Sequence, residues 1–368
     1  MSFAQRLALV VAAALAVSVG WRLSPALIDL FDGTEMPRVV TARGELAAEE
    51  RSTIELFQAT RDGVVAISTA ARVVDPWTRR SYDQPAGSGS GFLWDGQGHV
   101  VTNNHVIQGA SRATVALADG RRFEARLVGR DPSHDLAVLK IDAARLPEPV
   151  AIGTSRDLQV GQKVLAIGNP FGLDWTLTTG IVSALDRELT EDNGRTIRGL
   201  VQTDAAINPG NSGGLLLDSA GRLIGVNTAI FSPSGGSAGI GFAVPVGTVN
   251  RVVPQLIETG RYTPPGLGVR FDARVNALAN RQGIDGALVM SVEPGSPADR
   301  AGLDPARMTR DGRLVPGDVI RGIDGAQVRT LDDLEAQLDR LSPGQEVELD
   351  LRRNGESRSV SLSVTGGS

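Results

Sequence analysis

The order of apolar and polar residues divides the chain into four stretches. An apolar run covers residues 7–19, and a polar stretch without a sustained apolar period follows at 32–52. Short apolar runs between turn residues then continue to about residue 260, and a stretch with its own strand and helix patterns follows at 266–366. The pattern predicts an N-terminal helix at 1–31, a linker at 32–52 and two folded domains at 53–260 and 266–366.

The stretch 53–260 is predicted to be rich in short β-strands. A helix is expected from about Thr53, because apolar residues including Phe57 recur there at roughly helical spacing. Asp119-Gly120 lies between two apolar runs and is a strong hairpin signal. The expected strands are 64–67, 90–94, 99–102, 114–117, 123–128, 136–141, 163–167 and 223–227. Many short strands with frequent glycine turns are typical of all-β barrels.

Two prolines separate this domain from the next one. Pro264 and Pro265 follow a helix expected over 249–259 and form a stiff connector. Regularly spaced leucines then predict an amphipathic helix over 331–341. The expected strands are 287–292, 319–323, 347–352 and 359–364. This combination predicts a separate small α+β domain.

The N-terminal apolar run predicts a membrane anchor or a signal peptide. Its 13 residues are short for a membrane span and typical of a signal-peptide core, and Ala14-Leu15-Ala16 fits a cleavage site. Trp21 and Arg22 resemble an interfacial anchor that lengthens the span, so the uncleaved anchor is the favoured interpretation. A buried core helix is the third alternative, which the position at the extreme N-terminus disfavours. Arg6 before the run places the rest of the chain across the membrane.

Composition narrows the function classes. The 44 glycines and 4% aromatic residues favour a turn-rich β protein, and a net charge of −5 without a basic stripe argues against nucleic acid as a partner. The chain has no cysteine, which excludes disulfides, thiolate metal sites and cysteine nucleophiles. The sequence contains no HExxH, P-loop or GxGxxG motif, so no metal or nucleotide cofactor is expected.

One glycine-rich segment predicts a nucleophilic serine. Ser212 lies in Gly210-Asn211-Ser212-Gly213-Gly214, where the glycines allow positive φ and close approach to a substrate carbonyl. Successive N–H groups in such a turn can hold an oxyanion. All three histidines precede Ser212, which excludes the residue order of α/β-hydrolases and permits that of chymotrypsin-like enzymes. An ordinary glycine loop is the alternative interpretation of this motif alone.

A base and an orienting acid are also present. His105 follows the expected strand 99–102, and Asp135 opens the expected strand 136–141, where its carboxylate can fix an imidazole tautomer. His134 is a possible base on motif evidence, but strand neighbours point to opposite faces, so His134 and Asp135 cannot both point inward. We interpret His99 and His134 as solvated or structural. An acid after Arg130 could instead form a surface ion pair of little energy.

Taken together, these segments resemble the HtrA/Deg family of serine proteases from Thr53 nearly to the end of the chain. The motifs that carry the resemblance are Gly87-Ser88-Gly89-Ser90-Gly91-Phe92, Thr102-Asn103-Asn104-His105-Val106, His134-Asp135-Leu136-Ala137-Val138-Leu139-Lys140 and Gln202-Thr203-Asp204-Ala205-Ala206-Ile207-Asn208-Pro209-Gly210-Asn211-Ser212-Gly213-Gly214. The resemblance implies a mainly β fold: a chymotrypsin-like double β-barrel, then one α+β PDZ domain, after an N-terminal membrane or signal helix.

The resemblance also assigns roles in the site. It implies His105 as general base, Asp135 as its orienting acid and Ser212 as nucleophile. The backbone N–H groups of Gly210 and Ser212, with Asn211 between them, would form the oxyanion hole.

Substrate and ligand preferences follow from two further segments. The family pattern places Ala206 at the base of the S1 pocket, with Ile207 beside it and Ile230 on the wall. The absence of a carboxylate there predicts cleavage after small or aliphatic residues. Gly266-Leu267-Gly268-Val269 resembles the PDZ loop that binds a C-terminal carboxylate, although a glycine-rich strand start is the alternative on those residues alone. The motif Val315-Pro316-Gly317-Asp318-Val319-Ile320 favours the PDZ interpretation.

Regulation and assembly are expected from the same resemblance. Residues 184–198 correspond to a charged, flexible sensor loop in which Arg187 is the signalling residue, with an inert surface loop as the alternative. Relatives form trimers, and Phe57 is a candidate contact or an ordinary core residue. The single PDZ domain and the expected anchor resemble the membrane-tethered, stress-sensing branch.

The expected function is an ATP-independent, cofactor-free serine endopeptidase of misfolded or regulatory envelope proteins. It would lie on the periplasmic side of the inner membrane, or be soluble in the periplasm after signal cleavage. Its partners would be unfolded proteins and C-terminal peptides. The alternative is a chaperone or PDZ scaffold with a largely silent protease domain, but the intact set of His105, Asp135 and Ser212 favours the peptidase.

Overall fold

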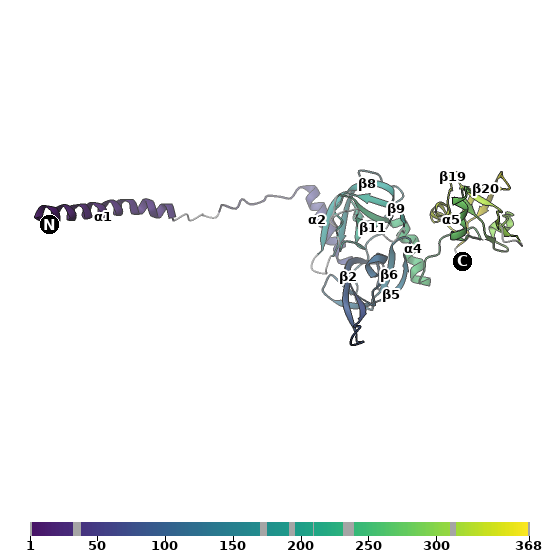
Figure 1. The fold of residues 1–368 in the computed structure, drawn as a ribbon, viewed down its shortest axis with the longest axis horizontal. Coiled ribbons are helices and arrows are strands. Elements are labelled where there is room, and N and C mark those ends of the chain that lie inside the picture. The colour runs from purple at the N-terminus through teal and green to yellow at the C-terminus, as the bar shows by residue number, and fades with distance from the viewer. Residues whose placement is uncertain are drawn as a thin grey trace. The chain divides into compact units, whose positions relative to one another are not determined.

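The computed structural model describes residues 2–31, 38–169, 175–190, 196–208, 210–230, 239–309 and 314–366. The chain forms two compact units, Met1–Arg51 and Ser52–Ser368. Figure 1 shows a long N-terminal helix, a β-rich body and a smaller C-terminal module.

The N-terminal unit is dominated by helix α1 (Phe3–Phe31). Its segment Phe3–Ser24 has 22 residues and a mean hydropathy of 1.9, and none of it is buried. The segment is therefore long and apolar enough to cross a membrane. It fits a membrane helix or a signal helix. Helix α2 (Ala48–Thr60) begins five residues before Thr53, so the prediction of a linker up to Ser52 was wrong for its last residues. Glu50 accepts a hydrogen bond from the N–H of Ala47 at 2.9 Å, and acids at a helix N-terminus are stabilising.

The β-rich body contains two closed six-stranded barrels, which confirms the prediction of a double barrel. The first has the order β1-β2-β3-β6-β5-β4 and the second the order β10-β11-β12-β9-β8-β7. A 3₁₀ turn, Arg61–Gly63, precedes the first barrel, and the four-residue helix α3 (Asn104–Ile107) follows β3. The strand bounds are β1 (Val64–Val74), β2 (Ser81–Leu93), β3 (His99–Thr102), β4 (Arg112–Ala116), β5 (Arg122–Asp131), β6 (Leu136–Lys140), β7 (Lys163–Gly168), β8 (Thr176–Thr190), β9 (Thr196–Thr203), β10 (Leu215–Asp218), β11 (Leu223–Ile230) and β12 (Gly241–Pro245).

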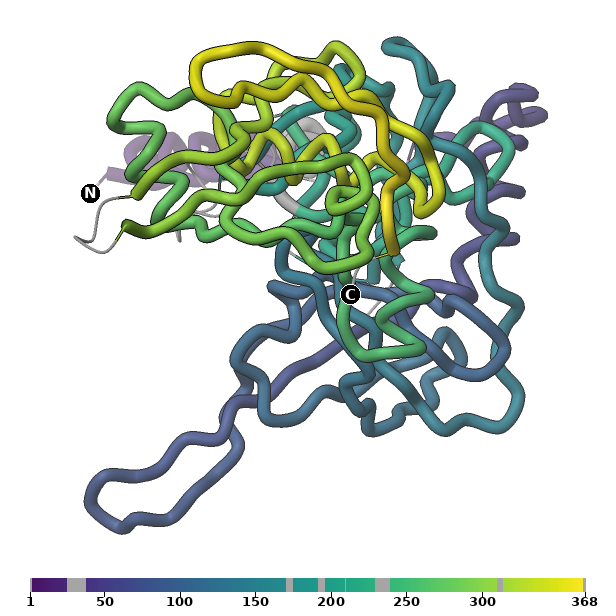
Figure 2. The backbone as a smooth tube through the Cα atoms, turned by 90° about the vertical axis from the view of Figure 1, so that its right-hand side faces the viewer, coloured from purple at the N-terminus to yellow at the C-terminus, as the bar shows by residue number. Residues whose placement is uncertain are grey.

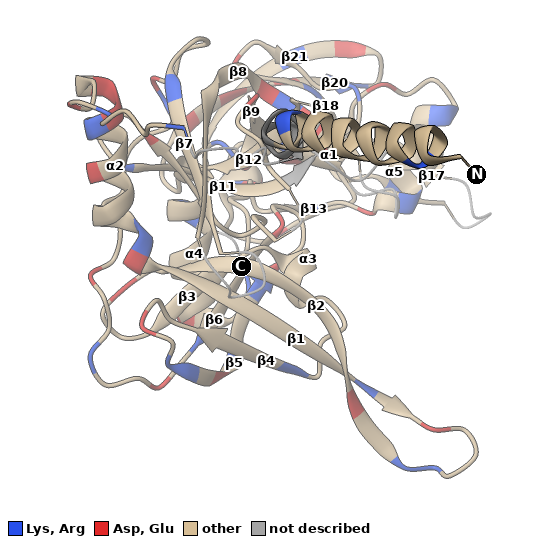
Figure 3. Ribbon diagram, turned by 90° about the vertical axis from the view of Figure 1, so that its left-hand side faces the viewer, with Lys and Arg blue, Asp and Glu red and all other residues tan. Residues whose placement is uncertain are grey.

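The first two strands extend well beyond the barrel as a hairpin, which stands out from the body in Figures 2 and 3. Their pairing continues from Val64↔Phe92 to Val74↔Ser81, although the apolar runs predicted only the buried part. The outer part is exposed, and Trp77 at its end is 92% exposed. Backbone pairing holds these residues as strand without burial of their side chains, so the hydrophobic pattern did not indicate them.

One apolar cluster joins the two barrels and helix α4 (Val246–Thr259). It includes Leu136 from β6, Ile167 from β7 and Val252 from α4, all fully buried. The end of α4 presses on β5 at Gly129, where an added Cβ would lie 2.7 Å from the carbonyl oxygen of Gly260. The helix that leads to the C-terminal module is therefore packed directly on the strand that leads to Asp135.

The segment expected to be a flexible sensor loop is mostly strand. Residues 184–190 belong to β8 and residues 196–198 to β9, and the intervening 191–195 lie outside the described residues. Their ladder is irregular, with register shifts around Ala184, Arg187 and Leu189. The prediction of a charged loop was wrong here because the strands are largely exposed, and exposed strands carry charged residues without an apolar alternation.

The C-terminal module has its own apolar core, which includes Leu267, Ile320, Leu334 and Leu349. Its largest sheet has the order β14-β18-β20-β21, with β19 paired to β18. The predicted strand 319–323 matches β18, and the helix predicted over 331–341 ends earlier, at Leu338. The sequence did not predict α5, which Asp272 caps through the N–H groups of Arg274 and Val275. The bounds are β13 (Val269–Arg270), α5 (Ala273–Arg281), β14 (Ala287–Leu288), β15 (Ser291–Val292), α6 (Pro297–Arg300), β16 (Arg307–Met308), β17 (Leu314–Val315), β18 (Val319–Ile323), β19 (Ala326–Gln327), α7 (Leu331–Leu338), β20 (Glu346–Arg353) and β21 (Glu356–Ser363).

Candidate active site

The turn that carries Ser212 depends on its glycines. Gly210 has φ 100° and Gly213 has φ 83°, in the left-handed region that disfavours other residues. A Cβ on Gly213 would lie 2.1 Å from the carbonyl oxygen of Ser90, and one on Gly214 would lie 2.2 Å from that of Ile167. The backbone is therefore packed against both barrels at this point, and side chains at these two positions are excluded.

Ser90, on β2 of the first barrel, holds this turn from the opposite side. Its hydroxyl donates to the carbonyl of Gly210 at 2.6 Å and accepts from the N–H of Asn169 at 2.7 Å. Its own N–H donates to the carbonyl of Ser212 at 2.8 Å. Ser90 lies in one of the family motifs, but no role in the site was predicted for it.

Backbone hydrogen bonds on either side of Ser212 fix the direction of the peptide groups around it. The N–H of Gly213 donates to Asn227 at 2.7 Å, and the N–H of Gly214 donates to Asn211 at 2.9 Å. Within the described ranges, the N–H groups of Gly210 and Ser212 have no acceptor. The arrangement therefore leaves available the two donors that the resemblance assigns to an oxyanion hole.

Ser90→Ala should weaken the contacts by which Ser90 holds the turn around Ser212. It leaves the buried carbonyl of Gly210 and N–H of Asn169 without their hydroxyl partner, which costs about 1–3 kcal/mol of unfolding free energy per orphaned group. Because the substitution disturbs the oxyanion donors only indirectly, kcat should fall by about tenfold, less than the 10²–10³ typical of losing a donor. Peptide kinetics and thermal unfolding measure both effects. Ser88→Ala, on the same strand, is the matched control, and an equal kcat for both variants would contradict the prediction.

Asp135 is held in a tight turn between β5 and β6. It has φ 54°, is 2% exposed, and its carbonyl accepts from the side chain of Asn103 at 3.0 Å and the N–H of Asn104 at 3.1 Å. His134 and Asp135 do not alternate across a strand as predicted, because both belong to the turn before β6. The turn, rather than strand pleat, determines where the carboxylate lies.

The carboxylate of Asp135 orients the ring of His105. One oxygen accepts from Nδ1 of His105 at 2.7 Å and the other accepts from its backbone N–H at 2.9 Å. A proton held on Nδ1 leaves Nε2 as the basic atom of the neutral ring. The structure thus joins two of the three predicted site residues directly.

Thr228, on β11, connects Ser212 to this pair. Its hydroxyl donates to the carboxylate of Asp135, and its carbonyl accepts from the hydroxyl of Ser212 at 2.7 Å. The side chain is 1% exposed. Thr228 was not predicted as a site residue, because a threonine within a buried strand carries no motif of its own. It brings the nucleophile and the acid to a common partner.

The other two histidines are structural. His99 is 9% exposed and its Nδ1 lies 2.6 Å from a carboxylate oxygen of Asp95. His134 lies between Asp131 and Asp339. Neither imidazole ring is largely exposed to solvent. The structural interpretation therefore holds for His99 and His134, and the solvated one does not.

The predicted specificity and regulatory residues belong to the strands of the second barrel and to the segment after β9. The carbonyl of Ala206 accepts from the hydroxyl of Thr178 at 2.9 Å, and Ile207 is 1% exposed within the core of the second barrel. The side chain of Ile230 lies outside the described residues. Arg187 on β8 donates from Nε to the side-chain oxygen of Gln202 at 2.9 Å.

The predicted carboxylate loop opens the C-terminal module. Gly266 pairs with Thr365 through two backbone hydrogen bonds of 3.0 and 2.7 Å, and Leu267 is buried in the core. Gly268 has φ 77°, and an added Cβ would lie 2.2 Å from Cβ of Ser296. The loop is therefore fixed at both ends, and a larger residue at Gly268 is excluded.

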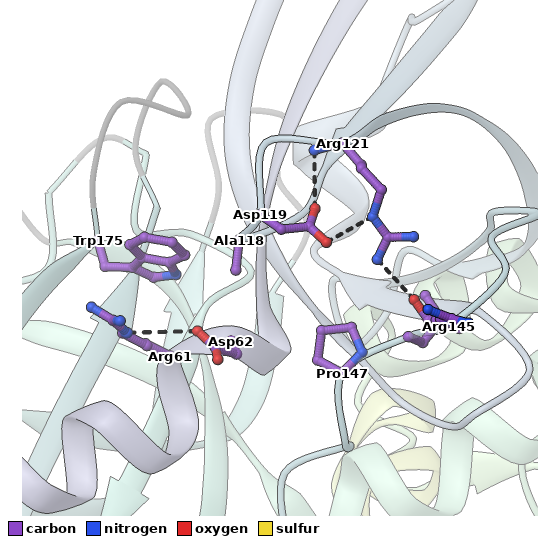
Figure 4. A pocket seen from close by; sticks show the side chains of 9 residues that line it. Arg61, Asp62, Ala118, Asp119, Arg121, Arg145, Pro147 and Trp175 are labelled. Atoms are coloured by element: carbon purple, nitrogen blue, oxygen red, sulfur yellow. Dashed lines mark hydrogen bonds and ion pairs between the residues drawn. The ribbon is translucent and has the colours of Figure 1, made fainter.

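A surface pocket seen in Figure 4 is separate from this set of residues. Its charged groups are largely paired: Arg121 donates to Asp119 and to the carbonyls of Ala144 and Arg145, and Arg61 lies over Trp175. Among the residues that the structure describes, no group of three or more His, Cys, Asp or Glu side chains could hold a metal. The pocket is lined by Arg61, Asp62, Ala118, Asp119, Arg121, Arg145, Leu146, Pro147 and Trp175.

Comparison with known proteins agrees with this geometry. Residues 89–226 match the trypsin-like peptidase domain family, and residues 265–364 match the PDZ domain family. Protease Do-like 1, chloroplastic, of Arabidopsis thaliana is 48% identical over 330 residues, covering 89% of this chain and 74% of the relative. A probable periplasmic serine endoprotease, DegP-like, of Halomonas elongata is 43% identical over 279 residues, covering 75% of this chain and 56% of the relative.

A solved structure extends the similarity to the fold of both domains. The HtrA-type protease AlgW with decapeptide has a TM-score of 0.61 and 39% sequence identity, covering 85% of this chain and 98% of that one. The double barrel, the PDZ domain and the identity to named serine endoproteases lead to one conclusion. The chain is a chymotrypsin-like serine protease and belongs to the HtrA/Deg family.

Proposed function

We propose that this protease hydrolyses peptide bonds in misfolded or regulatory envelope proteins with Ser212 as nucleophile, and that peptides bound to its PDZ domain control it. The observation that carries the chemistry is the shared contact at Thr228, which links Ser212 and Asp135 while Asp135 holds His105.

The proposed reaction follows from the directions of these groups. The hydroxyl of Ser212 turns from the carbonyl of Thr228 toward Nε2 of His105, which takes its proton as Oγ bonds to the substrate carbonyl carbon. Asp135 stabilises the imidazolium, and the N–H groups of Gly210 and Ser212 bind the oxyanion. The imidazolium then gives its proton to the leaving amine as the C–N bond breaks. Water hydrolyses the acyl-enzyme by the same proton transfers in reverse.

Cleavage after small or aliphatic residues is expected at the proposed S1 pocket. Ala206, Ile207 and Ile230 bring no charge to it, so lysine or arginine at P1 would be buried without a partner. An apolar pocket discriminates by about 1–3 kcal/mol per methylene, which predicts a broad preference for valine, alanine and isoleucine. Mass spectrometry of casein digests tests both the activity and this preference. A tryptic pattern would contradict the pocket assignment, and casein kept soluble without cleavage would favour the chaperone or scaffold alternative.

The proposed PDZ ligand is a protein C-terminus. Gly266-Leu267-Gly268-Val269 would bind its carboxylate through backbone N–H groups, and the peptide would add as a strand. The related AlgW structure with decapeptide supports peptide binding by this kind of protease. We further propose a homotrimer with Phe57 near the contact, and attachment to the periplasmic side of the inner membrane through α1. Two observations support that location: the Halomonas relative is named a periplasmic serine endoprotease, and the segment Phe3–Ser24 is apolar.

Arg187 is the proposed sensor of the PDZ state. Arg187 lies on a bulged part of β8, next to Asp186 with φ 53°. Such an irregular ladder can change its pairing, which gives the segment two arrangements. Arg187→Ala should lower activation by a C-terminal peptide about 5- to 150-fold, the range of typical allosteric coupling, while the fold is retained. Rates with and without peptide measure the ratio. Arg122→Ala, an exposed arginine on β5, is the control, and an unchanged activation ratio in Arg187→Ala would contradict the assignment.

A further inference from the structure

The hairpin formed by β1 and β2 exposes large apolar side chains at its end. We call residues 74–82 the hairpin tip, which lies at the end of the element that stands out from the body (Figures 2 and 3). Trp77 is 92% exposed, Val74 59% and Tyr82 53%. None of the three belongs to an apolar cluster of the described residues. Large apolar side chains gathered at the end of a projecting element indicate an interaction surface.

The hairpin tip is a fixed turn, and the pairing of β1 with β2 continues up to it. The N–H of Asp75 donates to the carbonyl of Arg80, and the N–H of Arg79 donates to the carbonyl of Asp75, each at 2.9 Å. One carboxylate oxygen of Asp75 also accepts from the N–H groups of Trp77 and Thr78, at 2.8 and 3.0 Å. The tip is therefore ordered before it meets a partner, which lowers the entropic cost of binding.

The charges of the hairpin tip favour an anionic partner. Arg79 and Arg80 are exposed, and among the described residues neither guanidinium forms an ion pair. The one acid of the tip, Asp75, directs its carboxylate at backbone N–H groups of the turn. Asp83, just outside the tip, lies 3.4 Å from Arg112. The tip is thus cationic on a chain whose net charge is −5.

Exposed apolar groups lie on both faces of the hairpin. Opposed residues of an antiparallel pair share a face, and neighbours along a strand lie on opposite faces. Val74 is opposite Ser81, so Tyr82 lies on the other face from Val74. A hairpin that packs on a protein needs one apolar face, whereas a hairpin that enters a bilayer meets the same surroundings on both. A stable protein contact also takes about 20–30 residues from each side, and the tip has nine.

Tryptophan, tyrosine and arginine together are suited to the headgroup region of a bilayer. Aromatic rings with a polar edge are enriched there, and arginine binds phosphate through paired N–H groups. The chain also has the segment Phe3–Ser24, which is long and apolar enough to cross a membrane. A tethered protein meets the bilayer at a high effective concentration, so a weak second contact is sufficient for binding.

We propose that the hairpin tip is a second membrane contact. It enters the headgroup region of a bilayer that contains anionic phospholipid, with Trp77 and Tyr82 at the boundary with the acyl chains and with Arg79 and Arg80 against the phosphates. The proposal rests on the proposed attachment through α1, which brings the tip to the bilayer. The tip would hold the first barrel of the protease at the membrane surface.

The absence of cysteine from the chain allows a single reporter at the hairpin tip. The full chain with Thr78→Cys, labelled with a polarity-sensitive fluorophore, is reconstituted in vesicles of phosphatidylcholine, alone or mixed with an equal amount of phosphatidylglycerol. With phosphatidylglycerol, we expect iodide quenching to fall and quenching by lipid-borne nitroxides to rise, each about fivefold or more. The reason is that one arginine near an anionic surface strengthens binding about fivefold. Ser219→Cys, in the exposed turn after β10, is the matched control and should quench equally in both vesicles.

Variants of the labelled chain separate the apolar and the charged contributions. Trp77→Ala should lower the bound fraction of the tip about tenfold in either vesicle, because the indole no longer leaves water. Arg79→Gln with Arg80→Gln should remove the difference between the two vesicles. Molar salt should have the same effect, since it shortens the screening length to about 3 Å. Arg122→Gln with Arg126→Gln, two exposed arginines on β5, removes the same charge and should leave quenching unchanged.

The outcomes distinguish the tip contact from the proposed attachment. Equal iodide quenching with and without phosphatidylglycerol, in a chain that floats with the vesicles, would overturn the tip contact alone. Protection of the label that depends on protein concentration and not on lipid would also overturn it, and would indicate a contact between copies of this chain. A full chain that does not float would overturn the attachment and the tip contact together. Hydrolysis of a short soluble peptide should be equal in all variants, because the tip is separate from the residues around Ser212. Should Trp77→Ala fail to fold, the arginine variant decides.

Discussion

Ser212→Ala should lower kcat by about 10⁶, the cost typical of removing the nucleophile or the base from a serine-protease triad. The alanine methyl cannot bond to the substrate carbonyl carbon, and the remaining groups can only bind and polarise the substrate. The fold should be unaffected, because the serine hydroxyl donates to the carbonyl of Thr228 and no buried group depends on it among the contacts of the described residues. Hydrolysis of a peptide with valine at P1 measures the loss.

The variant should still bind C-terminal peptides, because the proposed carboxylate loop at Gly266–Val269 does not involve Ser212. Fluorescence titration of a labelled hydrophobic peptide checks this, and thermal unfolding checks the fold. Retained peptide hydrolysis in Ser212→Ala would remove Ser212 from its role. Loss of both hydrolysis and peptide binding would indicate misfolding rather than chemistry.

Asp135→Asn should lower kcat by about 10⁴, the effect of the same change in a well-studied Ser-His-Asp enzyme. The carboxylate accepts from Nδ1 and from the backbone N–H of His105, and from the hydroxyl of Thr228. An amide offers only one acceptor atom and places an NH₂ group against one of these donors. The ring of His105 would then favour the tautomer with the proton on Nε2, which cannot accept the proton of Ser212.

Steady-state kinetics from acid to alkaline pH measures this loss. Asp142→Asn, at an exposed position just beyond β6, is the matched control and should leave kcat unchanged. Because Asp135→Asn alters the tautomer of His105 and not the peptide-binding surface, KM should change far less than kcat. A kcat within about tenfold of wild type would contradict the orienting role, since wrong-tautomer effects are much larger.

The buried parts of the fold were predictable because burial imposes an apolar pattern. The expected strands 99–102 and 319–323 coincide with β3 and β18, whose residues are almost all buried. The predicted site residues came from short motifs in which glycine, serine, histidine and aspartate have strict backbone requirements. Gly213 illustrates this, because the space beside it is closed by Ser90 and Thr102.

The other parts of the fold and of the site could not be predicted, because they depend on contacts between residues far apart in the sequence. Thr228 and Ser90 reach the site from β11 and β2, and no local pattern marks a hydroxyl whose partner lies on another strand. The ladder around Arg187 was predicted as a loop because its strands are exposed and charged. His134 was interpreted as solvated or structural, and only the fold brings Asp339 to its Nε2 atom.

Labelling with a serine-directed phosphonate tests the central claim most directly. The claim is that His105 activates the hydroxyl of Ser212 in a site prepared by both barrels. Mass spectrometry of the labelled full chain should locate a single adduct on Ser212, and His105→Ala should abolish it while the protein remains folded. A hydrophobic C-terminal peptide should accelerate labelling of the wild type. An adduct on another residue, or unchanged labelling of Ser212 in His105→Ala, would contradict the account.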